Sequence, residues 1–199
     1  MTRSPAGPPR PAVFLDRDGT LCREVGYLRD PRDFEWIPGA RRALARLNRA
    51  GFAAVVITNQ SGIARGFLDE DTLGRIHERM TSSLAESGAQ LDGIYWCPHH
   101  PQVGEAPWRQ ECRCRKPAPG LLERAAAELD LDLEASWIVG DSSRDLEAGA
   151  ALGLPGLLVA TGKGVDQAAQ LAREGRAVET VADVSEAVDR ILSARSQGR

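Results

Sequence analysis

Lysine is almost absent from this sequence of 199 residues: only Lys116 and Lys163 accompany the arginines among its 25 basic residues. A lysine retained in such a composition indicates a need for its compact ammonium group. Positive charge is not in excess either, because the formal net charge is −3, which argues against a broad basic face for nucleic acid or membranes. No apolar run approaches the ~20 residues that span a bilayer, and none is typical of a signal peptide. We therefore expect a cytoplasmic protein that binds neither nucleic acid nor membrane.

Proline is concentrated at the start of the chain, where the first eleven residues hold four of the 12 prolines and predict a flexible tail over 1–11. The remaining length suits one domain with a full core, expected to span 12–195 and to be monomeric. Strand and helix patterns alternate through it, as in a parallel sheet covered by helices in an α/β fold. The predicted strands are 12–16, 53–58, 94–97, 136–140, 156–160 and a short one near 178–180. The predicted helices are 38–51, opened by Pro38, and 69–86, 119–129, 143–152, 165–174 and 184–194.

Two carboxylates, Asp16 and Asp18, follow the first predicted strand within residues 13–21, just before Gly19. Open α/β sheets bind ligands at the carboxyl ends of their strands, and side-chain alternation lets both acids point the same way. Such a pair suits Mg²⁺, with one carboxylate as a nucleophile that forms an aspartyl-phosphate and the other moving protons. There are three alternatives. The first is a calcium loop, but its glycine is the sixth residue, whereas Gly19 is the fourth. The others are the metal-binding Asp-x-Asp of a nucleotide-sugar transferase and an acidic turn without chemistry.

Polar residues also follow other predicted strands. Thr58 ends the second strand, where its hydroxyl and the next backbone N–H groups can bind phosphoryl oxygens. Asp141 ends the fourth strand, although an acid there can also cap a helix. Arg115 and Lys116 place two cations before a helix, although a basic pair on a loop is usually just solvated. Together with the first two acids, these residues predict a site for Mg²⁺ and a phosphoryl group.

Three of the four cysteines cluster with histidine in Cys97-x-His99 and Cys112-x-Cys114. Four soft ligands are the number that a closed tetrahedral Zn²⁺ site needs. The one-residue spacers are shorter than usual, and disulfides are the alternative, although Cys112 and Cys114 are poorly spaced for each other. We interpret the cluster as a structural zinc site that staples the polar loop 97–116. Cys22 stands alone near the first acids, and a lone cysteine is more often inert filler.

In order and spacing, four motifs of this chain resemble those of the haloacid dehalogenase superfamily over residues 13–161. The motifs are Asp16-x-Asp18-Gly19-Thr20, Thr58, Lys116 and Gly140-Asp141-x-x-x-Asp145. The resemblance implies a three-layer, Rossmann-like parallel sheet with Asp16 as nucleophile and Asp18 as acid and base. It further implies that Thr58 and Lys116 hold the transferred phosphoryl group. Mg²⁺ is then expected on the Asp16 carboxylate, the Asp18 backbone carbonyl and Asp141, with Asp145 positioning Lys116.

Segment lengths limit the size of any cap over this site. About forty residues separate the first two motifs and already contain a predicted helix. The next segment, up to Lys116, holds a helix, a strand and the Cys/His loop. We therefore expect no large cap domain, an open pocket and recognition by surface loops.

Within the superfamily, the Cys/His loop and residues 58–66 are similar to the D,D-heptose 1,7-bisphosphate phosphatases. This resemblance implies Mg²⁺-dependent hydrolysis of the 7-phosphate of a small phosphorylated sugar. The residues it places at the substrate are Glu24, Val25, Gly26, Tyr27, Thr58, Asn59, Gln60, Ser61, Arg115 and Lys116. The related histidinol-phosphate phosphatases tend to carry an acid where this chain has Ser61, which favours the heptose branch. Ser142 departs from the family, in which a lysine at that position can assist the metal.

Arg115 provides a reason to expect two phosphates in the substrate. Neighbouring side chains on an extended backbone point apart, so Arg115 is free to bind a second anion if Lys116 faces the transferred phosphoryl group.

Two alternatives come from other classes of protein. A DNA 3′-phosphatase needs a basic groove, which the net charge does not favour. An inactive zinc scaffold would typically lack Asp16 or Lys116, and both are present.

Overall fold

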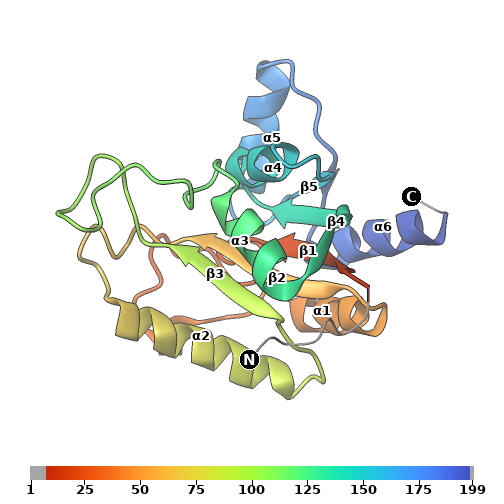
Figure 1. Cartoon of the computed structure of the whole chain (residues 1–199), viewed down its shortest axis with the longest axis horizontal. Coiled ribbons are helices and arrows are strands. Elements are labelled where there is room, and N and C mark those ends of the chain that lie inside the picture. The colour runs from red at the N-terminus through yellow and green to blue at the C-terminus, as the bar shows by residue number, and fades with distance from the viewer. Residues whose placement is uncertain (1–7, 198–199) are drawn as a thin grey trace.

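The computed structural model describes residues 8–197, which fold around one six-stranded, wholly parallel sheet (Figure 1). The strand order across the sheet is β3-β2-β1-β4-β5-β6, so the two strands at its centre are β1 and β4. The strands are β1 (Arg10–Leu15), β2 (Ala53–Asn59), β3 (Gly93–Cys97), β4 (Leu131–Gly140), β5 (Gly156–Val159) and β6 (Thr180–Val181). The predicted α/β fold is confirmed. From β1 the strands extend to one edge of the sheet through β2 and β3, and from β4 they extend to the other edge through β5 and β6. Sheets of this kind bind their ligands where the strand order changes, which is here between β1 and β4.

Helices cover both faces of the sheet. One face packs against α1 (Ala40–Arg49), α2 (Glu70–Ala85) and α6 (Val184–Ser196), and the other against α3 (Gly120–Leu129) and α4 (Ser143–Ala150). The remaining helices are α5 (Gly164–Arg173), which contacts β5, and the short 3₁₀ helix η1 (Pro31–Asp33). None of the helices within residues 8–197 is long and apolar enough to cross a membrane.

The central strands are apolar where both of their faces are buried, over residues 12–15 of β1 and 138–140 of β4. In β1, Val13 and Leu15 join the core beneath α1, α2 and α6, whereas Ala12 and Phe14 join the core beneath α3 and α4. All four side chains are fully buried. This rigid centre fixes the position of the residues that follow β1.

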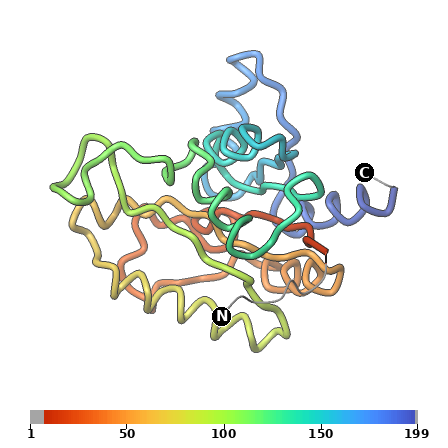
Figure 2. The backbone as a smooth tube through the Cα atoms, in the orientation of Figure 1, coloured from red at the N-terminus to blue at the C-terminus, as the bar shows by residue number. Residues whose placement is uncertain are grey.

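The segment between β3 and α3 has no helix or strand and extends well beyond the sheet (Figure 2). It contains the predicted Cys/His loop. Between β1 and β2 the chain forms only η1 and α1, and between β2 and β3 only α2. No insertion among the described residues therefore builds a large cap, as segment length predicted.

Several predicted boundaries were wrong. Arg10 and Pro11, assigned to the flexible tail, belong to β1, whereas residues 1–7 of that tail lie outside the described residues. Pro38 does not open a helix, because Gly39, with φ of 87°, precedes the first helical residue, Ala40. The strand expected at 136–140 begins at Leu131. Residues 131–132 pair with 10–11, and pairing resumes after a register shift at Val13.

Side-chain hydrogen bonding explains why β4 was underestimated. At the register shift, the Ser136 Oγ accepts a hydrogen bond of 2.8 Å from the Ala12 backbone N–H. Asp132 Oδ1 accepts hydrogen bonds from the backbone N–H groups of Glu134 and Ala135. Polar side chains thus replace ladder hydrogen bonds in this part of β4, and the sequence there has the composition of a turn.

Candidate active site

A cavity of about 320 Å³ lies at the carboxyl edge of the sheet, where residues following β1, β2 and β4 meet. It is lined by Asp16, Asp18, Glu24, Gly26, Tyr27, Leu28, Thr58, Asn59, Gln60, Ser61, Gly62, Arg65, Leu68, His100, Arg115, Lys116, Asp141, Ser142, Arg144 and Asp145. Of the predicted catalytic, magnesium-binding and substrate-binding residues, only Val25 is not among them. Val25 is 49% exposed, so the loop that carries Glu24 and Tyr27 directs its side chain away from the cavity.

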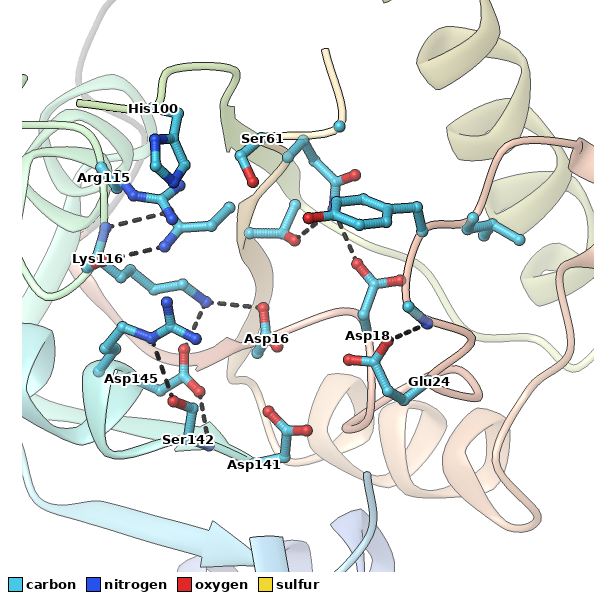
Figure 3. Close-up of a pocket in the computed structure, with 18 of the residues that line it drawn as sticks. Asp16, Asp18, Glu24, Ser61, His100, Arg115, Lys116, Asp141, Ser142 and Asp145 are labelled. Carbon is cyan, nitrogen blue, oxygen red and sulfur yellow. Dashed lines mark hydrogen bonds and ion pairs between the residues drawn. The ribbon is translucent and has the colours of Figure 1, made fainter. Parts of the chain in front are cut away.

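Lys116 is the buried cation of the site (Figure 3). Its Nζ lies 2.7 Å from Asp16 Oδ1 and 2.5 Å from Asp145 Oδ1, and it donates a hydrogen bond of 2.6 Å to the Ile57 carbonyl. Burial lowers the pKa of Lys116, but Asp145 and Asp16 outweigh burial and raise it above its ordinary value. Lys116 therefore remains charged, and it joins the ends of β1, β2 and β4.

Asp145 lies against Lys116, where the resemblance implied a positioning residue. Its side chain also accepts a hydrogen bond of 3.0 Å from the Ser142 backbone N–H, which closes a capping box at the start of α4. The capping box at the start of α4 thus fixes the Asp145 carboxylate, which in turn binds the Lys116 ammonium.

Asp16, Asp141 and Asp145 place carboxylate oxygens within 4.8 Å of one another. Burial raises the pKa of Asp16 to about 7, with the other acids adding to the effect and Lys116 opposing it. Burial likewise raises the pKa of Asp141 to about 6. The buried Lys116 pairs with Asp16 and Asp145, which leaves excess negative charge on the three acids. A further cation would relieve their repulsion, and hard oxygen donors suit Mg²⁺. The donor set fits the expected metal.

Gly19 allows the close approach of the loop after β1 to Asp141. A Cβ at this position would lie 2.1 Å from Asp141 Oδ2, and the φ of 84° is one that glycine adopts without strain. Asp141 Oδ2 is fixed from the other side by a 2.8 Å hydrogen bond from the Lys163 backbone N–H. A side chain at position 19 would therefore displace a metal-ligand candidate.

Asp18 has a different partner from the one that simple strand alternation predicts. Its carboxylate is not part of the three-acid cluster and instead accepts hydrogen bonds from Arg17 at 2.8 to 3.1 Å. Gln60 Nε2 donates to Asp18 Oδ2 at 2.8 Å. Burial raises the pKa of Asp18, but Arg17 and these hydrogen bonds outweigh burial and lower it. The idea that both carboxylates share one cation is thus wrong, because the buried guanidinium takes the second carboxylate.

The segment after β2 brings its polar residues to the same cavity. Thr58 is buried, and its Oγ1 accepts a hydrogen bond of 2.9 Å from Gln60. Both ends of the Asn59 amide bind the Lys116 backbone, at 3.0 and 3.1 Å. Asn59 therefore fastens the Lys116 segment to β2, and Ser61 lines the same cavity (Figure 3).

Four basic groups line the side of the cavity nearest the Cys/His loop: Arg65, His100, Arg115 and Arg144. Arg65 Nη2 contacts His100 Nε2 at 3.2 Å, and Arg115 Nη1 donates to the His99 carbonyl at 3.1 Å. Burial, with the two arginines nearby, lowers the pKa of His100. Sequence reasoning identified only Arg115. The available signals were the place of Arg65 in the 58–66 motif and that of His100 beside a predicted metal ligand.

Glu24 and Tyr27 form part of the opposite wall. Glu24 Oε2 lies 2.6 Å from Lys163 Nζ, and its Oε1 accepts a hydrogen bond of 2.6 Å from the Gly26 backbone N–H. The Tyr27 ring packs edge-on against Phe67 with 4.7 Å between ring centroids. These contacts join the 24–29 loop to the loops that follow β2 and β5.

The structure brings Cys97, His99, Cys112 and Cys114 together as predicted. Their sulfur atoms lie 3.2 to 3.6 Å apart, too far for a disulfide of about 2.05 Å. A tetrahedron with Zn–S bonds of about 2.3 Å has sulfur atoms about 3.8 Å apart, so the cluster fits zinc closely. His99 presents its Nδ1 to the cluster, 3.3 Å from Cys114 Sγ, while its Nε2 contacts the Gln110 amide at 2.9 Å. Gln110 thus contacts the His99 ring from outside the cluster, a contact that spacing alone could not predict.

Comparisons with known proteins agree with this geometry. A family model described as HAD-hydrolase-like matches residues 113–187. The D-glycero-beta-D-manno-heptose-1,7-bisphosphate 7-phosphatases of Photorhabdus laumondii and Escherichia coli K12 are each 44% identical to this chain over 180 and 179 residues. These matches cover 89% of this chain and 95% and 93% of the two relatives. The crystal structure of D,D-heptose 1,7-bisphosphate phosphatase from B. bronchiseptica, complexed with magnesium and phosphate, superposes with a TM-score of 0.82 and 36% identity. It covers 92% of this chain and 99% of that one.

The fold and the acid–lysine cluster define a phosphatase of the haloacid dehalogenase superfamily. Within it, the chain belongs to the family of the D-glycero-beta-D-manno-heptose-1,7-bisphosphate 7-phosphatases.

Proposed function

We propose that this protein removes the 7-phosphate of D-glycero-D-manno-heptose 1,7-bisphosphate in two steps through an aspartyl-phosphate. The observation that carries the proposal is the pairing of a three-acid cluster with a cationic wall in one cavity. The first suits a phosphoryl group undergoing transfer, and the second suits an anion that stays bound. The names of the relatives support the heptose substrate over histidinol phosphate.

In the first step, a carboxylate oxygen of Asp16 attacks phosphorus, and the bond from phosphorus to the sugar oxygen breaks. Asp18 acts in its protonated form and gives that proton to the oxygen as the alcohol leaves; because Arg17 and its hydrogen bonds lower the pKa of Asp18, the fraction that carries the proton is small. In the second step, water attacks the aspartyl-phosphate, Asp18 takes the proton from water, and Asp16 is regenerated with release of phosphate. Lys116 and Thr58 hold the transferred phosphoryl oxygens throughout.

Asp16, the Asp18 backbone carbonyl and Asp141 would hold the magnesium ion. When bound, Mg²⁺ supplies positive charge against the phosphoryl oxygens and offsets the repulsion between the acids. A magnesium ion named in the structure of the B. bronchiseptica relative supports this assignment. We assign a structural zinc ion to the four ligands of the Cys/His loop, which precedes Arg115 and Lys116 directly.

The basic residues near Arg115 would hold the phosphate that is not cleaved. Arg115 is half-buried, and burial lowers its pKa, so an anionic partner stabilises its charge. Its guanidinium can bind phosphate through two parallel hydrogen bonds. Arg65, whose Nε is buried with no hydrogen-bond partner among the described residues, stands next to it at the cavity wall.

The test compares Arg115→Ala with wild type on the heptose bisphosphate and on a heptose 7-phosphate that lacks the second phosphate. A lost charged hydrogen bond of about 1.5–3 kcal/mol lowers kcat/KM by roughly 10- to 100-fold on the bisphosphate alone. Arg113→Ala is the matched control, because its side chain is 78% exposed and pairs with Glu123. Equal impairment of Arg115→Ala on both substrates would show that this residue does not anchor a second phosphate.

A further inference from the structure

Arg17 is a fully buried arginine, and the mechanism above gives it no role. It is among the largest fully buried side chains of the described residues, with 0% exposure. Burying a guanidinium is costly unless all its charge and donors are satisfied. The site therefore has a reason to keep it there.

The guanidinium of Arg17 holds the carboxylate of Asp18 from behind. Its Nε and Nη2 donate to Asp18 Oδ1 at 3.1 and 3.0 Å, and its Nη2 also donates to Oδ2 at 2.8 Å. Gln60 Nε2 also donates to Oδ2, at 2.8 Å. A planar fork with two donors fixes the plane of a carboxylate as well as its position.

The remaining nitrogen of the guanidinium, Nη1, contacts His77, a partly buried residue of α2. Arg17 Nη1 lies 3.2 Å from His77 Nε2. Because arginine has only donors, Nε2 must accept, so the imidazole is neutral and carries its proton on Nδ1. Burial and the Arg17 charge lower the pKa of His77 to about 3, so the ring stays neutral across the working range of pH.

We propose that His77 is a positioning residue, which through Arg17 orients the Asp18 carboxylate for proton transfer to the leaving sugar oxygen. The chain from His77 to Arg17 to Asp18 links α2 to the catalytic loop across sixty residues of sequence. It leaves the Asp18 carboxylate one orientation, with the Arg17 fork on both oxygens and Gln60 also donating to Oδ2.

This role has a consequence that a merely structural role lacks. A sugar alkoxide is a poor leaving group and needs a proton, whereas p-nitrophenolate leaves without one. General acid catalysis contributes about 10²–10⁴-fold when it is needed. Misorientation of Asp18 should therefore reduce kcat/KM on an alkyl phosphate and spare p-nitrophenyl phosphate.

The experiment measures kcat/KM on the heptose bisphosphate and on p-nitrophenyl phosphate for four proteins. His77→Leu removes the acceptor, and His77→Gln restores one through its amide oxygen. Glu78→Gln changes the neighbouring exposed residue as a control. We expect His77→Leu to lose about tenfold on the bisphosphate, with KM little changed, and about twofold or less on p-nitrophenyl phosphate. His77→Gln should recover most of the loss, and Glu78→Gln should match wild type.

Equal losses on both substrates, no loss on either, or no recovery in His77→Gln would overturn the proposal. Arg17→Lys is a second perturbation with the same expected selectivity, and the His77 series decides the matter if that variant does not fold. The inference rests on the proposed phosphatase activity, and the wild-type rates separate the two. If the wild-type protein is inactive on both substrates, the proposed function is refuted. If the wild-type protein is active and His77→Leu keeps the wild-type kcat/KM on both substrates, only the positioning role is refuted.

Discussion

Replacing Lys116 by methionine should destabilise the protein strongly, because it leaves two buried carboxylates without their cation. Lys116 and Asp145 have side chains only 3% exposed, and Asp16 is 12% exposed. Methionine matches the length of the lysine stem, so packing is largely kept. Removing one partner of a buried ion pair costs about 3–5 kcal/mol. For a chain of this size, each kcal/mol corresponds to roughly 2–4 °C, which gives a fall in Tm of roughly 6–20 °C.

The direction of the pH effect follows from the same geometry. Without Lys116 the two acids avoid repulsion by binding protons, so the loss should be smaller at pH 5 than at pH 8. Lys163→Met is the matched control, because the only other lysine also pairs with a carboxylate, at 2.6 Å, but is 56% exposed. An exposed pair contributes about 0–1 kcal/mol. Thermal melts of magnesium-free protein that retains its zinc test this. Equal Tm values for the two variants would refute the reasoning.

Three further predictions concern the metals and the nucleophile. Cys112→Ser should lose the one zinc per chain on mild chelation, and its activity should fall because the Lys116 segment becomes disordered. Cys22→Ser should retain zinc. Elemental analysis measures the zinc, and a phosphate-release assay measures the activity. The pKa values of Asp16 and Asp141 are raised to about 7 and about 6, so stability falls as pH rises from about 4 to about 7. The gain in Tm from Mg²⁺ should thus be larger at pH 8 than at pH 5, and equal gains would contradict the assigned site. Asp16→Asn should abolish turnover because it removes the nucleophile. It should not lower Tm, because it removes one of three crowded negative charges. Activity in the folded variant, with deamidation excluded, would refute the role of Asp16 as nucleophile.

The sheet and the acids at its edge were predictable because each depends on local sequence. Asp16 and Asp141 directly follow β1 and β4, Thr58 lies at the carboxyl end of β2, and parallel strands end at one edge. Cys97 and Cys112 could be grouped by ligand type, since a polar loop without its own core needs a staple. Topology and composition were enough in these cases.

The rest depended on contacts between distant segments, which spacing does not encode. The guanidinium of Arg17 takes the Asp18 carboxylate, and His77 from another element holds that guanidinium. Asn59 lines the cavity as expected, but its hydrogen bonds to the Lys116 backbone were not foreseen. Val25 was expected there too, yet the turn at Gly26 leaves it at the surface. Side-chain direction in loops follows from tertiary packing rather than from residue type.

Phosphorus-31 NMR of the wild-type reaction tests the central claim most directly. The protein is incubated with Mg²⁺ and D-glycero-D-manno-heptose 1,7-bisphosphate, as separate anomers, and the two phosphate signals are followed in time. The account predicts that the signal of the primary C7 phosphate converts to inorganic phosphate while the anomeric phosphate persists. Loss of the anomeric signal first, or no phosphate release from either anomer by protein that hydrolyses histidinol phosphate, would contradict it.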